Sequence, residues 1–358
     1  MRYRKLGKTG LTVSELGFGT IPILSGSVPV LPEYFSPDVP TAVEIMTLAF
    51  DLGCNFFDTA VPEEYGDAEY KLGIFAQKVT EKFGRNKIII SDKARFYDGN
   101  DIYSAAIKSC ENLGTYPDIY FVHQADPENS DRIFEKYGAM DALCDLKAEQ
   151  KIRFTGIASH YFDVLFRAAN DPRVDVLQCS GNIFERGMLD RISAEKIFLN
   201  KGLIVNKIFA AGLLNGIFTV NELIGGVLDY PFSSALIGLG SFEQVEAAMG
   251  RGIEPKKFTF DEVIGRVKNK FEPIACTRCQ RCKCPHGVEP HIIFRQYNYY
   301  FFGKSFWALN KLGLNIEKAR DLCLRCENKE CEKNCPKNLH ISELIEKTAK
   351  FAARHIDV

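Results

Sequence analysis

The sequence predicts an α/β protein: a parallel (β/α)8 TIM barrel followed by a smaller, mainly helical cysteine-rich domain. Short β-rich segments alternate with amphipathic helical stretches through about the first 250 residues, the usual length of such a barrel. The alternation stops after Arg251. Eight of the 12 cysteines then lie between Cys276 and Cys335. We therefore expect a barrel over residues 1–252, a helical linker over 253–275 and a cysteine-rich domain over 276–358.

Each predicted strand is a short run rich in β-branched and aromatic residues. The stretches between them, such as 101–113 and 134–150, carry apolar residues at helical spacing. A doubly wound open sheet is the alternative, but the Gly17-Phe18-Gly19 run after the first strand stops short of a dinucleotide-binding fingerprint. The eight predicted strands are Glu15–Thr20, Asn55–Thr59, Lys87–Ser91, Asp118–His123, Arg153–Ser159, Val174–Cys179, Leu203–Phe209 and Ser234–Gly238.

Composition and charge exclude several classes of protein. With 46% hydrophobic and 25% charged residues, the chain is typical of a globular protein. It has neither a transmembrane-length apolar run nor the apolar core of a secretory signal, so we expect a cytoplasmic protein without a membrane partner. From residue 270 onward, 16 Lys and Arg face 10 Asp and Glu, a net charge of +6. Four of these cations, Arg278, Arg281, Lys283 and Arg325, lie among cysteines, and a metal cluster bound by thiolates would be anionic. No nucleic-acid partner is therefore expected.

Four polar residues fall at the carboxyl ends of predicted strands 2, 3 and 4, or just beyond them. Asp58 and His123 end their strands, Lys93 follows the third strand, and Tyr65 lies in the loop after Asp58. On a parallel barrel such side chains converge at one rim. Taken singly, each has a structural explanation: a helix cap, a hydrogen-bonded imidazole, a solvated amine or an aromatic at the rim.

Together the four side chains make a chemical unit. A tyrosine hydroxyl has a pKa of ~10 and is a poor proton donor at neutral pH. A nearby ammonium lowers that pKa, and a carboxylate holds the ammonium in place. A neutral imidazole can orient a carbonyl oxygen against the acid. These are the groups needed to protonate an oxygen while hydride arrives on carbon.

Over about residues 1–250 the chain resembles the aldo-keto reductase superfamily. Several spaced motifs agree in order with that family: Tyr3–Leu11, Val13–Thr20, Asn55–Ala60, Tyr65–Glu69 and Leu72-Gly73. The resemblance implies a (β/α)8 barrel, NAD(P)H as hydride donor and a small carbonyl or alcohol substrate. It implies Tyr65 as the general acid/base, with Lys93 and Asp58 tuning it and His123 orienting the substrate.

The resemblance also implies where the nicotinamide cofactor binds. Ser159-His160 stands where the family usually has Ser-Asn at the carboxamide, and Gln178 and Asn182 match the next strand. Ser241 followed by Gln244 is a capping-box signature, which marks a helix N-terminus able to receive an anion. The arginine that many members place in this loop is absent, which leaves NADH or NADPH open. The phosphate-binding residues would be Gly238, Gly240, Ser241 and Gln244.

The clustered cysteines form two groups, each ending in Cys-Pro and each resembling the bacterial ferredoxin run C-x2-C-x2-C-x3-C-P. The spacing departs from that pattern, since one residue separates Cys282 from Cys284 and four separate Cys326 from Cys331. Two 4Fe–4S clusters are expected, and two structural zinc sites are the alternative. The fourth cysteine of each ferredoxin run binds the other cluster. The implied ligand sets are Cys276, Cys279, Cys282 and Cys335 for one cluster, and Cys323, Cys326, Cys331 and Cys284 for the other.

The expected function is that of an iron–sulfur oxidoreductase of the aldo-keto reductase type, and some relatives in that superfamily carry a similar tail. The clusters either relay electrons from an acidic redox partner such as a ferredoxin or have a structural role and only hold the tail over the barrel. Arg278, Arg281, Lys283 and Arg325 would steer that partner or offset the anionic clusters. A rival hypothesis is an electron-transfer or complex subunit whose barrel only binds a small molecule. The aromatic segment 294–307 is expected to pack the tail onto the barrel, or else to line an apolar substrate site.

Overall fold

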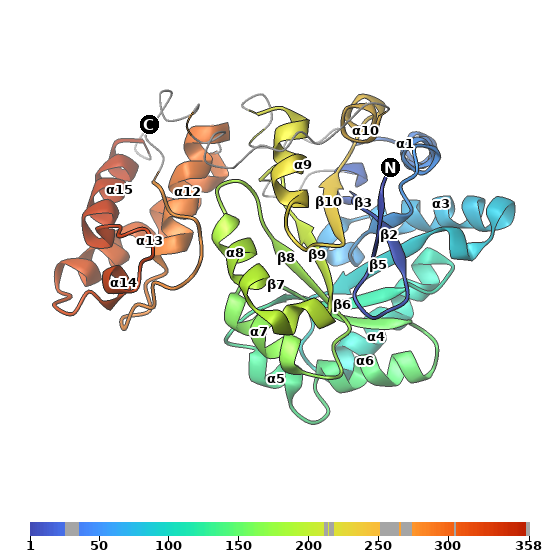
Figure 1. Ribbon diagram of the computed structural model, residues 1–358, viewed down its shortest axis with the longest axis horizontal. Helices are drawn as coiled ribbons and strands as arrows, with labels where there is room; N and C mark the ends of the chain where they lie inside the picture. The colour runs from blue at the N-terminus through green and yellow to red at the C-terminus, as the bar shows by residue number, and fades with distance from the viewer. Residues whose placement is uncertain are drawn as a thin grey trace.

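A closed barrel of eight parallel strands, with a group of helices packed at one side, forms the molecule in the computed structural model (Figure 1). The structure describes residues 1–25, 36–210, 214, 218–250, 265, 274–303 and 306–355. Strand β10 pairs with β3 and closes the barrel, which confirms the predicted (β/α)8 fold. In barrel order the strands are β3 (Leu16–Gly19), β4 (Phe56–Asp58), β5 (Ile89–Ala94), β6 (Ile119–Ala125), β7 (Phe154–Ser159), β8 (Val176–Ser180), β9 (Gly202–Asn206) and β10 (Ser234–Gly238).

Amphipathic helices surround the strands and bury one side against them. Helix α1 shows how the sequence sets a helix start: the Asp38 carboxylate accepts a hydrogen bond from the Thr41 N–H, and Pro40 occupies the first turn. The helices of the barrel are α1 (Val39–Asp51), α2 (Pro62–Tyr65), α3 (Ala68–Phe83), α4 (Gly99–Leu113), α5 (Ser130–Phe134), α6 (Ala139–Ala148), α7 (Phe162–Asn170), α8 (Arg186–Ala194), α9 (Val220–Leu228) and α10 (Phe242–Met249). Among the described residues, three 3-10 turns accompany them: η1 (Ile21–Ile23), η2 (Arg85–Lys87) and η3 (Lys196–Asn200).

The barrel interior is filled by apolar side chains and closed at its amino end. Phe56 and Phe121 lie in one buried cluster with Leu6 and Val13, which belong to or flank the hairpin of β1 (Tyr3–Lys5) and β2 (Thr12–Ser14). Gly156 makes room for the Phe121 ring, because a Cβ at that position would lie 2.2 Å from a ring carbon. A filled interior leaves the carboxyl rim as the place for a site.

Several predicted elements have different boundaries in the structure, and two of these differences have a clear backbone cause. The helix expected over 134–150 begins only at Ala139, as α6, and Phe134 instead ends α5. The backbone packs tightly at Gly138, where a Cβ would lie 2.2 Å from the Arg132 carbonyl oxygen. The strand expected to reach Phe209 ends at Asn206, since Lys207 has a φ of 59° and leaves the extended conformation.

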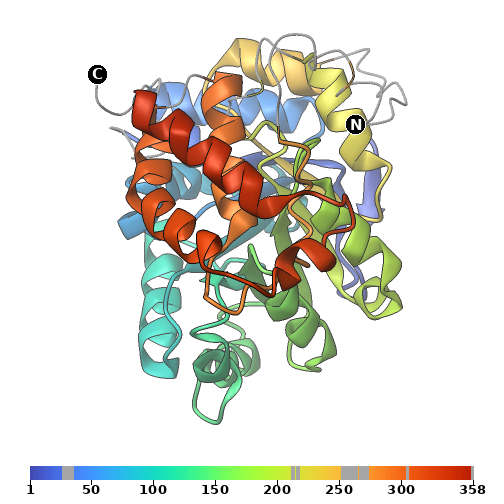
Figure 2. The ribbon, with the colours of Figure 1, turned by 90° about the vertical axis from the view of Figure 1, so that its left-hand side faces the viewer.

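The cysteine-rich domain has its own helices and its own buried core, which includes Phe294, Leu312 and Ile345. Figure 2 shows these helices in front of the barrel. They are α12 (Pro290–Gly303), α13 (Phe306–Leu324), α14 (Glu330–Lys333) and α15 (Ile341–His355). Most of the predicted linker, 253–264 and 266–273, lies outside the described residues. Within the part of the chain that is described, no helix combines the length and apolarity needed to cross a membrane.

Candidate active site

The structure brings Asp58, Lys93 and Tyr65 together at the carboxyl rim of the barrel. Lys93 lies inside β5 rather than after it, and its ammonium is buried. Lys93 Nζ lies 2.6 Å from Asp58 Oδ2 and donates to the Thr59 carbonyl oxygen at 2.5 Å. The same Nζ lies 5.1 Å from the centroid of the Tyr65 ring. The buried carboxylate therefore holds one ammonium directly beside the tyrosine.

The environment of Tyr65 differs from the sequence-based expectation of a lowered pKa. Burial raises the pKa of the Tyr65 hydroxyl, and this outweighs the opposing effect of the Lys93 ammonium. Burial also opposes the charge on Lys93, but the carboxylate of Asp58 more than compensates and raises the pKa of that amine. Lys93 therefore stays charged, and Tyr65 stays protonated at neutral pH.

His123 is paired with a residue that the sequence analysis did not single out. His123 Nδ1 lies 2.6 Å from Glu64 Oε2. Burial lowers the pKa of His123, partly offset by Glu64, while His123 and Arg95 hold the pKa of Glu64 below its usual value despite burial. In the neutral imidazole the proton then belongs on Nδ1, which leaves Nε2 as an acceptor. The only sequence signal for Glu64 is its place directly before Tyr65.

The expected carboxamide-binding residues lie at the ends of β7 and β8. Gln178 donates from Nε2 to Asp58 Oδ1 at 3.2 Å, while its buried Oε1 has no partner among the described residues. Ser159 Oγ donates to the Ala125 carbonyl oxygen at 2.5 Å. His160 Nδ1 lies 2.9 Å from Ser180 Oγ, and its Nε2 lies 3.3 Å from Lys207 Nζ. The unpaired Gln178 oxygen is an acceptor that a carboxamide N–H could satisfy.

The side chains expected to contact the cofactor at two other places form hydrogen bonds within the protein itself. Asn182 Oδ1 accepts the backbone N–H groups of Phe184 and Glu185, so its side chain holds the loop that leads to α8. Ser241 is the N-cap of α10 and accepts the Gln244 N–H at 3.3 Å, while Gln244 Oε1 accepts the Gly240 N–H at 2.8 Å. The predicted helix N-terminus is therefore present, and the N–H group of Gly240 in the preceding loop already donates to the Gln244 side chain.

Lys207 is a cation at the rim that the sequence analysis missed. It follows β9 directly, and its side chain is exposed to the mouth of the barrel. Desolvation of its amine by the surrounding side chains, together with the cations of Arg295 and Arg278, lowers the pKa of Lys207 to about 7. No sequence motif indicated Lys207, because it lay inside the predicted strand Leu203–Phe209.

The first cysteine loop is anchored to this rim through a buried ion pair. Arg278 Nη1 lies 2.6 Å from Glu185 Oε2 and donates to Ser180 Oγ at 3.2 Å. Tyr299 Oη donates to Glu185 Oε1 at 2.9 Å. Burial would raise the pKa of Glu185, but Arg278 and Arg295 outweigh it and lower the value to about 2. Arg278 is therefore used inside the interface and does not face a partner.

Backbone and amide contacts complete this interface. The Gln280 side chain accepts the Phe162 N–H at 2.9 Å and donates to the His160 carbonyl oxygen. The Gly187 N–H donates to the Thr277 carbonyl oxygen at 2.9 Å, and a Cβ on Gly187 would lie 2.7 Å from that same oxygen. The loop that carries Cys276 and Cys279 thus contacts the segment that positions His160.

The eight clustered cysteines are gathered into two sets of four. Cys276, Cys279, Cys282 and Cys335 line one pocket, together with His291 and Phe294. The Cys323 thiol interacts electrostatically with Cys284, Cys326 and Cys331. Within the described ranges, no three His, Cys, Asp or Glu side chains surround a point as a single metal ion requires.

The aromatic segment is shared between the tail core and the interface. Phe294 and Tyr297 are buried in the tail core, and Tyr297 packs against Phe301 and Phe351. Tyr299 is the member that reaches the barrel, through its hydrogen bond to Glu185. The side chains of Phe302, Phe306 and Trp307 lie outside the described residues.

A (β/α)8 barrel with a buried Lys–Asp pair beside a tyrosine at its carboxyl rim defines a barrel enzyme. Residues 15–225 match the model of the aldo/keto reductase family. L-galactose dehydrogenase of Arabidopsis thaliana is 32% identical over 320 residues, which cover 76% of this chain and 94% of that protein. The chain therefore belongs to the aldo/keto reductase family, and it is an oxidoreductase.

Other comparisons agree with this assignment. An aldo-keto reductase of Gibberella moniliformis is 32% identical over 153 residues, which cover 40% of this chain and 44% of that protein, so the match spans less than half of its length. The structure of an aldo-keto reductase from Bacillus halodurans, in its holo form, has a TM-score of 0.59 and 21% identity. It covers 75% of this chain and 96% of that chain, and at this identity it shows the fold alone. The family match ends at residue 225, before the cysteine-rich domain.

Proposed function

We propose that the protein is an iron–sulfur aldo-keto reductase, which interconverts a carbonyl group and an alcohol on a small organic substrate. The observation that carries this proposal is the buried Asp58–Lys93 pair beside Tyr65 at the carboxyl rim, with Nζ and Oδ2 2.6 Å apart. In this proposal the domains are the barrel at 1–252, the linker at 253–275 and a dicluster domain at 276–358.

Tyr65 would exchange the proton with the substrate oxygen. In carbonyl reduction the hydroxyl of Tyr65 gives its proton to the oxygen, and the Lys93 ammonium stabilises the tyrosinate that remains. His123 would orient the same oxygen. Neutral His123 accepts a hydrogen bond from an alcohol through Nε2, and protonated His123 donates one to a carbonyl.

Bound NAD(P)H would supply the hydride to the carbonyl carbon. The buried, unpaired Gln178 Oε1 supports a carboxamide site there, with Ser159 and His160 beside it. The Asn182 loop would support this wall. The N-terminus of α10, with Gly238, Gly240 and Ser241 before it and Gln244 in its first turn, would receive the cofactor phosphates.

The two sets of cysteines would each hold one 4Fe–4S cluster. Each set contains four thiols, which is the number of protein ligands that such a cluster requires. Burial raises the pKa of Cys276 to about 12 and that of Cys323 to about 11, so the free thiolates are strongly disfavoured. Binding iron would remove that cost. All 12 cysteines are free of disulfides, which supports a reducing compartment such as the cytoplasm.

Anaerobically purified protein is expected to contain about eight irons per chain, as two four-iron clusters require. Cys279→Ser should lower this by about half, because one ligand set is broken. Cys110→Ser and Cys144→Ser are the controls, since neither residue belongs to a set, and they should keep the full iron content. Iron and zinc are measured by elemental analysis together with visible absorbance. Stoichiometric zinc without charge-transfer absorbance would contradict the cluster proposal.

Glu64→Gln is expected to lower kcat by about 10-fold, part of the roughly 10²–10⁴-fold that a positioned proton-transfer group contributes. The carboxylate stabilises the imidazolium of His123, so its removal lowers the His123 pKa further. In alcohol oxidation, which uses neutral His123, the acidic limb of the pH–rate profile should therefore move to lower pH. Glu63→Gln is the matched control, because Glu63 is exposed and adjacent. A profile identical to that of the unaltered enzyme would exclude a positioning role for Glu64.

The proposal as a whole is tested by measuring carbonyl reduction with NADH and NADPH, before and after the clusters are removed. Turnover with intact clusters is expected. Turnover that persists at the same rate without iron would assign the clusters a structural role. An iron-loaded enzyme that binds neither nicotinamide nor any carbonyl compound in a broad panel would contradict the proposal.

A further inference from the structure

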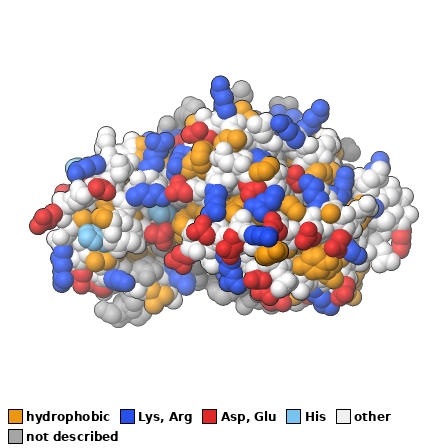
Figure 3. All heavy atoms as spheres, turned by 90° about the horizontal axis from the view of Figure 1, so that it is seen from below, with side chains coloured by type: hydrophobic (Ala, Val, Ile, Leu, Met, Phe, Trp, Pro, Cys, Tyr) orange, Lys and Arg blue, Asp and Glu red, His pale blue; other side chains and the backbone are white. Residues whose placement is uncertain are grey.

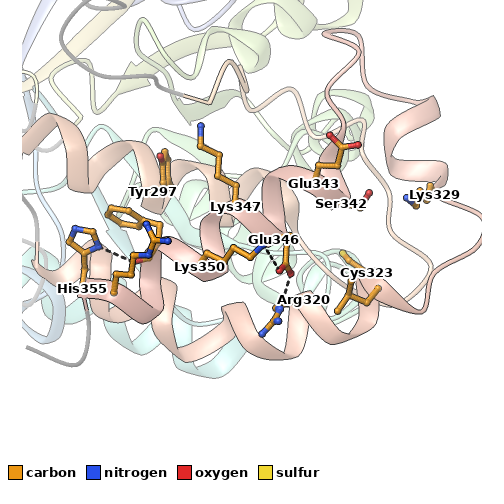
Figure 4. Close-up of a pocket in the computed structure, with 13 residues that line it drawn as sticks. Tyr297, Arg320, Cys323, Lys329, Ser342, Glu343, Glu346, Lys347, Lys350 and His355 are labelled. Carbon is orange, nitrogen blue, oxygen red and sulfur yellow. Dashed lines mark hydrogen bonds and ion pairs between the residues drawn. The ribbon is translucent and has the colours of Figure 1, made fainter.

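A basic groove runs between α13 and α15 on the tail. Figure 4 shows Arg320 and Lys350 directed towards Glu346, with Lys347 and Lys329 also along the groove. Figure 2 shows α15 on the side of the tail turned away from the barrel. The groove is lined by Tyr297, Arg320, Cys323, Leu324, Lys329, Ser342, Glu343, Glu346, Lys347, Lys350, Phe351, Arg354 and His355.

The lining carries a clear excess of positive charge. Five Lys and Arg side chains face two Glu side chains, apart from His355. Glu346 already pairs with Arg320 at 2.8 Å and with Lys350 at 3.3 Å. Lys347, Lys350 and Arg354 are exposed and follow one another at i, i+3 and i+7, which places them on one face of α15. On the face of the molecule in Figure 3, by contrast, acidic and basic side chains are interspersed.

The groove reaches one of the two sets of cysteines. Cys323 lines it, and this thiol interacts with Cys284, Cys326 and Cys331. Leu324, next to Cys323, also lines the groove and is 68% exposed. Leu324 thus places an exposed apolar side chain amid positive charge, and protein docking surfaces combine apolar contacts with a polar rim.

The other set of cysteines faces the barrel. A Cβ on Gly187 would lie 2.7 Å from the Cβ of Cys279, and Arg191 Nη1 donates to the Cys279 carbonyl oxygen at 2.8 Å. The order along the tail is therefore groove, Cys323 set, Cys276 set and barrel rim. This order suits a path that begins at the groove and ends beside the candidate active site.

We propose that the groove between α13 and α15 is the docking site for an acidic one-electron carrier protein. The inference rests on the proposed iron–sulfur function and adds the place of electron entry. In each encounter the reduced carrier loses one electron, and a cluster held by the Cys323 set gains it. Charge complementarity would accelerate the encounter, and Leu324 would contact the partner surface.

The test uses the full-length, iron-loaded protein and reduced flavodoxin, an acidic one-electron carrier, as the probe. Flavodoxin reoxidation is followed by stopped-flow absorbance at several ionic strengths. The variant Lys347→Glu/Arg354→Glu reverses two charges of the groove. The matched control Lys136→Glu/Lys151→Glu makes the same change in charge at exposed positions on the barrel. Iron content and reduction by dithionite show whether each variant is intact.

The groove variant is expected to lower the second-order rate constant by about 10-fold or more at low salt, and to flatten its dependence on salt. The barrel variant should behave like the unaltered protein. Equal rates for both variants would overturn the docking inference while their iron content upholds the proposed function.

Calorimetric binding of flavodoxin separates the two proposals further, because binding does not require iron. Suppose that the purified protein lacks iron. If flavodoxin then binds the unaltered protein and the barrel variant but not the groove variant, the result still supports the docking site. Equal binding by both variants overturns it. If inorganic phosphate binds the unaltered protein but not the groove variant, and flavodoxin binds neither, the groove is a small-anion site and the inference is wrong.

Discussion

Replacing Tyr65 by phenylalanine is expected to abolish hydride transfer while leaving nicotinamide affinity nearly unchanged. The hydroxyl would act only where charge develops on the substrate oxygen, so its loss removes stabilisation of the transition state and little ground-state binding. A fall in kcat of roughly 10²–10⁴-fold or more is expected from the loss of a positioned acid. The buried Lys93 ammonium would keep its partner Asp58 and the aromatic ring beside it, and lose only the hydroxyl.

Single-turnover reduction of a carbonyl substrate measures the chemical step, and fluorescence titration measures nicotinamide binding. Tyr103→Phe is the control, since that hydroxyl belongs to α4 and donates to Glu149 at the outer surface. Turnover of the Tyr65→Phe variant at nearly the original rate would remove Tyr65 from the acid role. A parallel loss of nicotinamide affinity would instead indicate that the hydroxyl shapes the binding site.

Glu185→Ala is expected to release the tail from the barrel. The substitution leaves Arg278 buried without its carboxylate, and it removes the acceptor of the Tyr299 hydroxyl. Breaking a buried ion pair by deleting one partner costs about 3–5 kcal/mol. The interface should therefore open at lower temperature and lower denaturant concentration, and proteolysis should cut the chain between barrel and tail. Glu195→Ala, at an exposed position just after α8, should leave proteolysis unchanged.

Acidification should reproduce the effect of this substitution. The pKa of Glu185 falls from its ordinary value of 4.5 to about 2 in the folded protein. A depressed carboxyl pKa gives stability that is present above the unfolded value and is lost as the pH falls through the folded value. Glu185 should therefore contribute about 3 kcal/mol above pH 4.5, lost progressively towards pH 2. If Glu185→Gln releases its tail over the same pH range as the unaltered protein, the ion pair does not hold the interface.

Much of the barrel could be predicted from local patterns. Short β-rich runs at regular spacing predicted the strands. Polar residues at the carboxyl ends of these strands predicted a candidate site at that rim of the barrel. Asp58, Lys93 and Tyr65 could be grouped because a parallel barrel places the ends of neighbouring strands together. Boundaries were less predictable. The start of α6 after Gly138 and the end of β9 before Lys207 depend on backbone packing and conformation, which the periodicity of the sequence does not show.

The contacts made by the basic side chains of the tail could not be predicted in the same way. Arg278 and Lys283 stood out as basic residues among cysteines, yet Arg278 is buried against Glu185 and Lys283 pairs with Asp163. The basic groove instead combines side chains from α13 and α15, including Arg320 and Lys347. Charge counted along the chain gives a total, but it does not say which side chains are neutralised by residues distant in sequence.

By itself, the sequence determined the barrel, the polar residues at its carboxyl rim and the order of the cysteines, because each depends on spacing within one segment. Only the tertiary structure decided that Glu64 faces His123 and that Glu185 receives both Arg278 and Tyr299. It also decided that burial raises the pKa of Tyr65 despite Lys93. Ion pairs between distant segments and the desolvation of a side chain depend on which surfaces meet: α2 against β6 for Glu64, and the tail against the barrel for Glu185.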